Sequence, residues 1–234
     1  MENKKTIIGI IIVAILIIGL IIASYLYSDF SKQQLNLLTD ETNTILKSDI
    51  LTEGINLEIK SEKNYAIVEK AIKEYLLKLK NIYSNIDETY NQINPNDIFS
   101  AKNIEDKNFE EVDAILANYK EKGKNSISEY KELTKEENIS KNIKDKNITS
   151  RTDYYIDLYN TVMLSDVMKE KYASIENEIE RKKDELNNKI EKLGKIEDFL
   201  KENNKYWSIK DDKIQFNNVN KMTEYYNLLN KIED

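Results

Sequence analysis

The chain contains no cysteine and no histidine. Without cysteine there is no disulfide framework, no thiol nucleophile, no cysteine zinc site and no residue to carry the lipid of a lipoprotein. Without histidine there is no Ser-His-Asp triad, no H-E-x-x-H metalloprotease motif and no imidazole that titrates near neutral pH. These absences remove most enzyme classes. The sequence therefore predicts a protein that is not an enzyme and that needs no cofactor and no metal.

Glycine and proline are also scarce, with five glycines and one proline in 234 residues. The glycines form neither a G-x-G-x-x-G nor a P-loop pattern, so no phosphate-binding loop is expected. Asp145, Asn147 and Thr149 have the spacing that starts a calcium loop. Ser150 and Ile156, however, stand where an EF-hand needs glycine and glutamate, which excludes an EF-hand. Few chain breaks favour long helices.

Positive charge is in the minority, since 35 lysines and arginines face 42 acidic residues for a net charge of −7. A chain of this sign lacks the basic surface that nucleic-acid binding requires, so no nucleic acid partner is expected. Arginine occurs only at Arg151 and Arg181, while lysine, asparagine, isoleucine and tyrosine are abundant. This bias is typical of an AT-rich genome and indicates a low-GC, Gram-positive-like bacterium. Adjacent carboxylates such as Glu110 and Glu111 arise by chance at this acidic content and do not indicate a glycosidase pair.

A long apolar run near the N-terminus is the strongest positive feature. Residues 7–23 carry no polar side chain, and about 20 such residues in a helix cross a hydrocarbon core of about 30 Å. Tyr25 and Tyr27 follow the run, where aromatic residues anchor a span at the membrane interface. The predicted anchor covers residues 6–27 and includes Ile7, Ile11, Ile15, Ile18, Ile22, Tyr25 and Tyr27.

A cleaved signal peptide is the alternative interpretation of this segment, but it needs an apolar core of roughly 7–15 residues and a small-x-small exit. The run here is longer, and only Ala23 and Ser24 offer small residues near its end. An uncleaved anchor is therefore favoured. Lys4 and Lys5 precede it, so the positive-inside rule predicts a cytoplasmic tail over residues 1–5 and an extracytoplasmic body, in a single-pass protein of the cell membrane.

Beyond the anchor, apolar residues recur at spacings of three and four, as in helices that pack in a bundle or coiled coil. One stripe covers residues 65–93, ends at Asn94–Pro95, and has Ser61 or Asn64 as its expected N-cap. A middle helix is predicted over residues 105–133.

Another helix is predicted over residues 152–203, with an apolar stripe over residues 172–200. Lys182 and Lys189 occupy core positions of this stripe, where their long stems are expected to pass the seam and reach water. The polar run over residues 134–151 is predicted to be a flexible loop.

The anchor helix is expected to continue outward to about residue 48, because Leu35, Leu38 and Ile45 indicate an apolar face. A short apolar alternation after residue 52 indicates either a brief strand or a helix restart.

The C-terminal part changes character. Two short apolar runs at residues 206–209 and 214–216 flank a charged turn and predict a β-hairpin. Asn217 or Asn218 can cap a final helix. Because an isolated hairpin is marginal in water, hairpin and helix are expected to form one accessory unit over residues 204–234.

These patterns predict an all-α fold: an N-terminal transmembrane helix, an elongated antiparallel helical bundle or coiled coil over residues 28–203, and the small hairpin–helix unit. Each apolar stripe must be buried against another helix, and a bundle of three or four helices satisfies all of them. Self-association through the same stripes is the competing arrangement.

Two aromatic pairs form the candidate interaction patch. Tyr154 and Tyr155 lie beside Arg151, and Tyr206 and Trp207 lie in the predicted hairpin. Exposed tyrosine and tryptophan are enriched in binding hot spots. The alternative is that these rings pack in the bundle and in the hairpin core.

The sequence thus predicts a membrane-anchored extracytoplasmic helical protein that acts as a structural scaffold or a protein-interaction module. Its expected partners are the membrane and either another protein or a second copy of the chain. The alternative is an extracytoplasmic domain that binds or senses a small ligand between its helices. Against that alternative, a tail of residues 1–5 leaves no cytoplasmic output domain.

Overall fold

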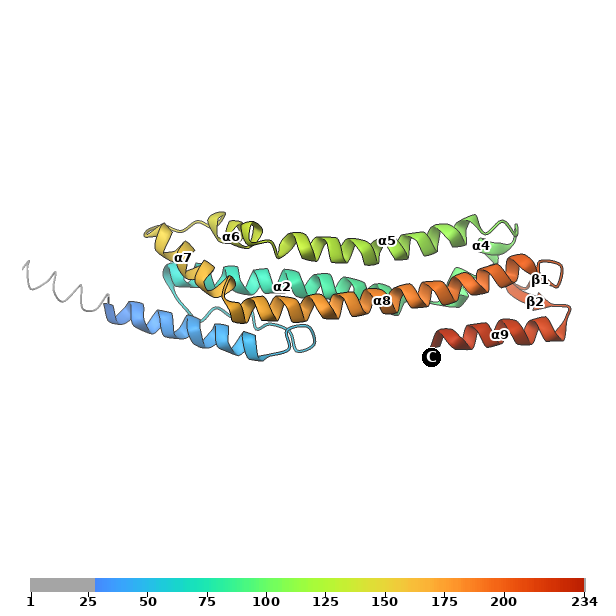
Figure 1. Cartoon of the computed structure of the whole chain (residues 1–234), viewed down its shortest axis with the longest axis horizontal. Coiled ribbons are helices and arrows are strands. Elements are labelled where there is room, and N and C mark those ends of the chain that lie inside the picture. The colour runs from blue at the N-terminus through green and yellow to red at the C-terminus, as the bar shows by residue number, and fades with distance from the viewer. Residues whose placement is uncertain (1–27, 234) are drawn as a thin grey trace, which may run out of the picture.

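The computed structural model describes residues 28–233, which are mostly helical with one two-stranded antiparallel sheet. Figure 1 shows an elongated molecule whose helices follow one long axis. Its centre is formed by α2 (Lys63–Gln92), α5 (Glu110–Leu133) and α8 (Asp166–Glu202). Helices α2 and α8 run in the same direction and α5 runs against them (Figure 1). The prediction of a mostly helical bundle with a small hairpin is confirmed.

The predicted membrane anchor at residues 6–27 lies outside the described residues. Within residues 28–233, none of the helices combines the length and the apolar character that crossing a bilayer requires. The predicted outward helix is present over residues 28–47, shown in blue in Figure 1, and we call it helix 28–47. After it the chain turns back, and residues 55–60 form neither strand nor helix, so neither the strand nor the helix restart predicted there is present.

The inward face of helix 28–47 differs from the predicted one. Leu38 and Ile45 are buried as expected, but Leu35 is 37% exposed. Gln34 and Glu41 are buried in its place. The prediction for Leu35 is wrong because the face that meets the bundle contains polar residues, which an apolar pattern does not detect.

The stripe predicted over residues 65–93 forms the core face of α2. Both predicted N-caps are wrong, since Glu62 precedes the first turn and no side chain caps it. The Ser61 hydroxyl instead donates to Glu69, and the Asn64 amide binds the chain that leads into α7. The stripe residues that are buried in α2 are Tyr65, Val68, Ile72, Tyr75, Leu79, Ile82 and Ile86.

Two short helices, α3 (Pro95–Ile98) and α4 (Ala101–Ile104), lead from α2 into α5. The Asn94 side chain accepts a hydrogen bond from the Asn96 N–H at 3.0 Å, which caps α3 ahead of its proline. The middle helix predicted from residue 105 begins later, at Glu110. The reason is Phe109, whose φ of 60° is incompatible with a right-handed helix.

The polar run over residues 134–151 contains α6 (Glu136–Lys144), so the prediction of a flexible loop is wrong for these residues. Ile139 and Ile143 are one turn apart, and both are buried in the core that α2 and α7 share. A helix this short is stabilised mainly by packing of its apolar face, and two isoleucines supply that face.

The single helix predicted over residues 152–203 is interrupted and forms α7 (Thr152–Met163) followed by α8. The interruption is at Leu164 and Ser165. The Ser165 hydroxyl oxygen accepts a hydrogen bond from the Met168 N–H at 3.3 Å and so caps α8. The prediction of one continuous helix is wrong because the spacing of apolar residues carries no signal of this cap.

The hairpin is confirmed as β1 (Trp207–Lys210) paired with β2 (Lys213–Phe216). The turn residues Asp211 and Asp212 have φ values of 53° and 57°, as a two-residue type I′ hairpin turn requires. The final helix is α9 (Val219–Glu233). The Asn218 side chain accepts from the Lys221 N–H at 3.1 Å, which confirms the predicted cap.

Three tyrosines form a layer across the bundle where α5 and α7 end. The Tyr75 hydroxyl donates to the carbonyl of Leu133, and the Tyr172 hydroxyl donates to the carbonyl of Met163 at 3.1 Å. The Tyr130 hydroxyl donates to the carbonyl of Tyr172 at 2.6 Å. Burial raises the pKa of all three phenols. The hydroxyls of Tyr75 and Tyr172 thus satisfy carbonyls at the ends of α5 and α7 that have no donor within their own helices.

Candidate functional site

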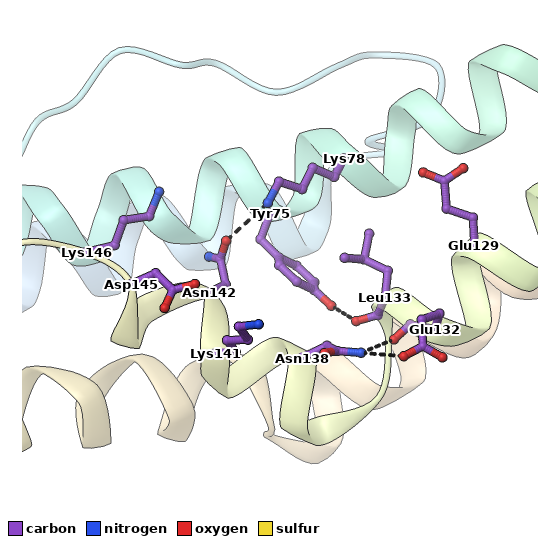
Figure 2. A pocket seen from close by; sticks show the side chains of 10 residues that line it. All are labelled: Tyr75, Lys78, Glu129, Glu132, Leu133, Asn138, Lys141, Asn142, Asp145 and Lys146. Carbon is purple, nitrogen blue, oxygen red and sulfur yellow. Dashed lines mark hydrogen bonds between the residues drawn. The ribbon is translucent and has the colours of Figure 1, made fainter.

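A groove of about 610 Å³ lies where α2, α5 and α6 meet (Figure 2). Small-molecule sites commonly measure about 300–1,000 Å³, so the size suits a small ligand. The lining is mostly polar and charged, and Leu133 is its one aliphatic side chain. Such a lining would recognise a polar molecule through hydrogen bonds and charge rather than through apolar burial.

Tyr75 is the most buried residue of the groove, at 1% exposure, and its hydroxyl points to the end of α5 (Figure 2). Burial raises its pKa, so the phenol stays protonated at neutral pH. Beside it, the Asn142 amide donates to the Ala71 carbonyl and to the Tyr159 hydroxyl, both at 3.1 Å. These bonds hold the wall of the groove in one arrangement.

The amines of the groove come from α2, α6 and the chain just after α6. Lys146 pairs with Glu74 at 2.8 Å, and this bond holds the pKa of Glu74 below its usual value. Lys78 donates to the Asn142 side chain at 3.3 Å. Lys141 makes no ion pair in the described part of the chain and lies in the middle of the groove (Figure 2).

The carboxylates of the groove are Glu129, Glu132 and Asp145. Glu132 pairs with Lys135 at 2.5 Å and accepts from the Asn138 amide at 3.0 Å. Glu129 and Asp145 make no ion pair among residues 28–233. The groove therefore presents unpaired groups of both charges. The groove lining does not place a nucleophile beside a base. Within the described range, no three acidic side chains gather as metal ligands would.

Tyr154 and Tyr155, from the predicted interaction patch, lie at the start of α7. Their rings pack edge to face at 5.0 Å between centroids, and the ring of Tyr65 lies 5.1 Å from that of Tyr155. Tyr155 is buried, whereas Tyr154 is partly exposed with the Arg151 guanidinium 4.7 Å from its ring centroid. This pair contributes to the core more than to the surface.

Tyr206 and Trp207 lie at the opposite end of the bundle, and Trp207 belongs to the second of its two core clusters. Trp207 is 3% exposed. Its indole N–H donates to the Leu200 carbonyl at 2.9 Å, and its ring meets Phe109 edge to face at 6.2 Å. Tyr206 is partly exposed. The structure does not bring the two aromatic pairs together, and the predicted membrane-anchor residues lie outside the described range.

Comparisons of the chain with protein-family models, curated proteins and solved structures find no match.

An exposed apolar face on α9 was not predicted. Val219, Met222 and Tyr226 are 72%, 38% and 53% exposed, and their spacing of three and four places them on one side of the helix. The adjacent side of α9, with Tyr225 and Ile232, is buried in the bundle, and burial raises the pKa of Tyr225 to about 12. The spacing of apolar residues in α9 does not indicate which of them remain outside.

A buried charge cluster between helix 28–47 and α2 was also missed. The Lys73 side chain is 1% exposed, and its ammonium donates to Glu41 at 2.8 Å, to Glu69 at 2.7 Å and to the carbonyl of Glu58. Glu41 also pairs with Lys60. Glu69 and Lys73 are four residues apart, but such pairs are common on exposed helix faces, so the spacing alone does not reveal burial.

The two carboxylates of this cluster are held in their charged form. Burial alone would raise the pKa of Glu41, but its bonds to Lys60 and Lys73 outweigh burial and lower it. Burial likewise opposes the charge of Glu69. Bonds from Lys73, from the Ser61 hydroxyl at 2.6 Å and from the Ser61 N–H at 2.8 Å lower its pKa below the usual value.

Proposed function

We propose that the protein is a membrane-anchored extracytoplasmic spacer that presents a protein-interaction surface away from the membrane. The observation that carries the proposal is the placement of two features on the elongated bundle. Helix 28–47 begins at one end, and the hairpin with the start of α9 closes the other end (Figure 1). The first described residues of helix 28–47 and the exposed face of α9 therefore lie toward opposite ends of the bundle's long axis.

The apolar stripes of α2 and α8 are not available to a partner, which favours the face of α9 as the contact surface. Their core positions are buried within one chain, so they offer no open seam for a second copy. Lys182 and Lys189, which interrupt the stripe of α8, bind α2 at its edge. Lys182 pairs with Asp87 at 2.8 Å, and Lys189 donates to the Tyr90 carbonyl at 3.2 Å. The face of α9 is helical and apolar, and it fits the apolar face of a helix in a partner protein.

In-cell cross-linking from the face of α9 tests the proposal. A variant with Val219→Ser, Met222→Ser and Tyr226→Ser should lose one defined cross-linked protein that the unmodified chain captures. Val167→Ser is the matched control, because Val167 is 58% exposed at the start of α8, on a different part of the bundle. If capture is equal in all three proteins, the face of α9 is not the contact. If the chain fractionates away from membranes, the anchoring part of the proposal fails.

A second candidate function is binding of a small polar molecule in the groove. The observation that favours it is the presence of unpaired amines and carboxylates around one 610 Å³ groove. A zwitterion such as an amino acid or a short peptide has the matching charges. Thermal-shift measurements with such compounds should show stabilisation that Lys141→Ala reduces. The absence of stabilisation by any amino acid or dipeptide at millimolar concentration would reject this function.

A further inference from the structure

The surface by which helix 28–47 docks onto the bundle is largely polar. Gln34, Glu41 and Thr42 are buried on this face together with Leu38 and Ile45. The core faces of α2, α5 and α8, by contrast, are lined mainly by aliphatic and tyrosine side chains. Buried polar groups lose hydration on docking and regain it on undocking. Docking therefore stabilises helix 28–47 by less free energy than it would stabilise an apolar helix of the same length.

Hydrogen bonds and ion pairs hold this helix at three places along its length. The Gln34 side-chain oxygen accepts from the Glu62 N–H at 2.6 Å. Glu41 binds Lys73, as described above. At the end of the helix, the ammonium of Lys171 from α8 donates to the Ser48 carbonyl at 2.5 Å. These bonds specify one register of the helix on the bundle.

The bundle retains its own contacts when this helix leaves. Lys73 keeps its bond to Glu69, because both residues belong to α2. Helix α2 also packs against α5, α7 and α8 independently of helix 28–47. The two helices are joined by a loop over residues 48–62 that contains irregular chain and Gly54, with a φ of 88°. Such a connection lets one helix move without unwinding the other.

We propose that helix 28–47 is a releasable element, which leaves the bundle as a unit while α2, α5 and α8 stay folded. The Glu41–Lys73 contact is the bond that controls release. This inference goes beyond the proposed function and does not depend on it. Combined with that function, release would lengthen the link between membrane and bundle by residues 48–59 of the loop, whose about 12 residues reach up to about 40 Å.

Thiol labelling of the full-length chain in detergent tests release, because the chain has no cysteine of its own. Thr42→Cys reports on helix 28–47, and Ser126→Cys reports on the central bundle. The two sites are matched. Both are buried, and both hydroxyls bond only to the carbonyl four residues earlier in their own helix, at 2.8 and 3.1 Å.

Glu41→Gln is the perturbation, and Asp87→Asn is its control, since it weakens an ion pair between α2 and α8 instead. A hydrogen bond between charged groups is worth about 10- to 100-fold in an equilibrium constant. Glu41→Gln should therefore speed labelling of Thr42→Cys by about that factor and leave Ser126→Cys unchanged. Asp87→Asn should not speed the labelling of Thr42→Cys relative to the labelling of Ser126→Cys.

Equal acceleration at both cysteines by Glu41→Gln would mean that helix 28–47 opens only when the whole bundle unfolds, which overturns the proposal. No acceleration at either cysteine overturns it as well. If Glu41→Gln does not fold, the urea dependence of labelling in the otherwise unmodified chain decides. Release of one helix exposes less surface than global unfolding, so labelling of Thr42→Cys should depend more weakly on urea. An equal dependence rejects the proposal.

Discussion

Trp207 is expected to stabilise the far end of the bundle rather than to bind a partner. Its indole N–H donates to the Leu200 carbonyl. This carbonyl lies in the last turn of α8, where it has no N–H donor within the helix. The Lys107 ammonium lies 4.6 Å from the centre of its ring, and the same ammonium donates to the Asn204 carbonyl at 2.6 Å. Removing the ring should therefore destabilise the hairpin, the turn before α5 and the end of α8 together.

The magnitude follows from these contacts. Truncation of a buried tryptophan to alanine costs about 3–5 kcal/mol. Trp207→Phe keeps most of the apolar contact but leaves the Leu200 carbonyl without its donor, at a cost of about 1–3 kcal/mol. For a chain of this size each kcal/mol lowers Tm by about 2–4 °C. Trp207→Ala should therefore lower Tm by about 6–20 °C.

Thermal unfolding followed by far-UV circular dichroism measures these shifts. Tyr206→Ala is the control, because its ring is partly exposed and is expected to cost less than about 1 kcal/mol. The reasoning is refuted if Trp207→Ala shifts Tm no more than Tyr206→Ala. A Trp207 variant of unchanged stability that loses a bound partner would restore the interpretation of Trp207 as a recognition residue.

Three further predictions concern the helices and the charge cluster. Gly194→Ala should raise the unfolding free energy by about 0.5–1 kcal/mol in urea denaturation, because a Cβ there meets no atom within 4 Å. Gly123→Ala should raise the unfolding free energy by less than this or lower it, since its Cβ would lie 3.1 Å from a leucine methyl. Equal gains in stability at both positions would contradict the close packing at Gly123. The lowered pKa values of Glu41 and Glu69 stabilise the folded chain above their ordinary value of 4.5, and that contribution is lost as the pH falls below it. The stability difference between the unmodified chain and Glu41→Gln should therefore shrink on acidification, and a pH-independent difference would show that Glu41 is not ionised in the fold. Asn142→Ala should cost about 1–3 kcal/mol in urea denaturation, because it removes the donor to two buried acceptors; a smaller loss would show that water replaces the amide.

The long helices were predictable because burial imposes a period on the sequence. A core face such as that of α2 must present an apolar side chain at every third or fourth residue, and this pattern is visible without a structure. The hairpin was predictable for a similar reason, since two short apolar runs flank a turn that matches the type I′ geometry of Asp211 and Asp212.

The helix ends were not predictable, because contacts from distant parts of the chain decide them. Ser61 and Asn64 are good capping residues, yet Glu69 and the chain before α7 bind their side chains instead. Ser165 caps α8 in the middle of a continuous apolar pattern. Competition between local and distant hydrogen bonds is invisible in residue spacing.

The candidate site was the least predictable part. The groove is assembled from three helices, and no short segment carries its lining. The charge cluster was hidden because Glu41 lies in a helix of otherwise mixed polarity, and nothing local indicates that Lys73 lies opposite it. Aromatic residues such as Trp207 stood out in the sequence, but their prominence reflected packing of the core.

The tyrosine layer has a consequence for how the molecule bends. Two of the three central helices are interrupted near this level, where α5 gives way to α6 and α7 to α8, while α2 alone continues through it. A rod is least stiff where the fewest continuous elements cross a section, so bending is concentrated there. The hydroxyls of Tyr75 and Tyr172 tie α2 and α8 to the ends of the interrupted helices. Phenylalanine in place of Tyr75 and Tyr172 would keep the volume but remove these two bonds, and should make bending at this level easier.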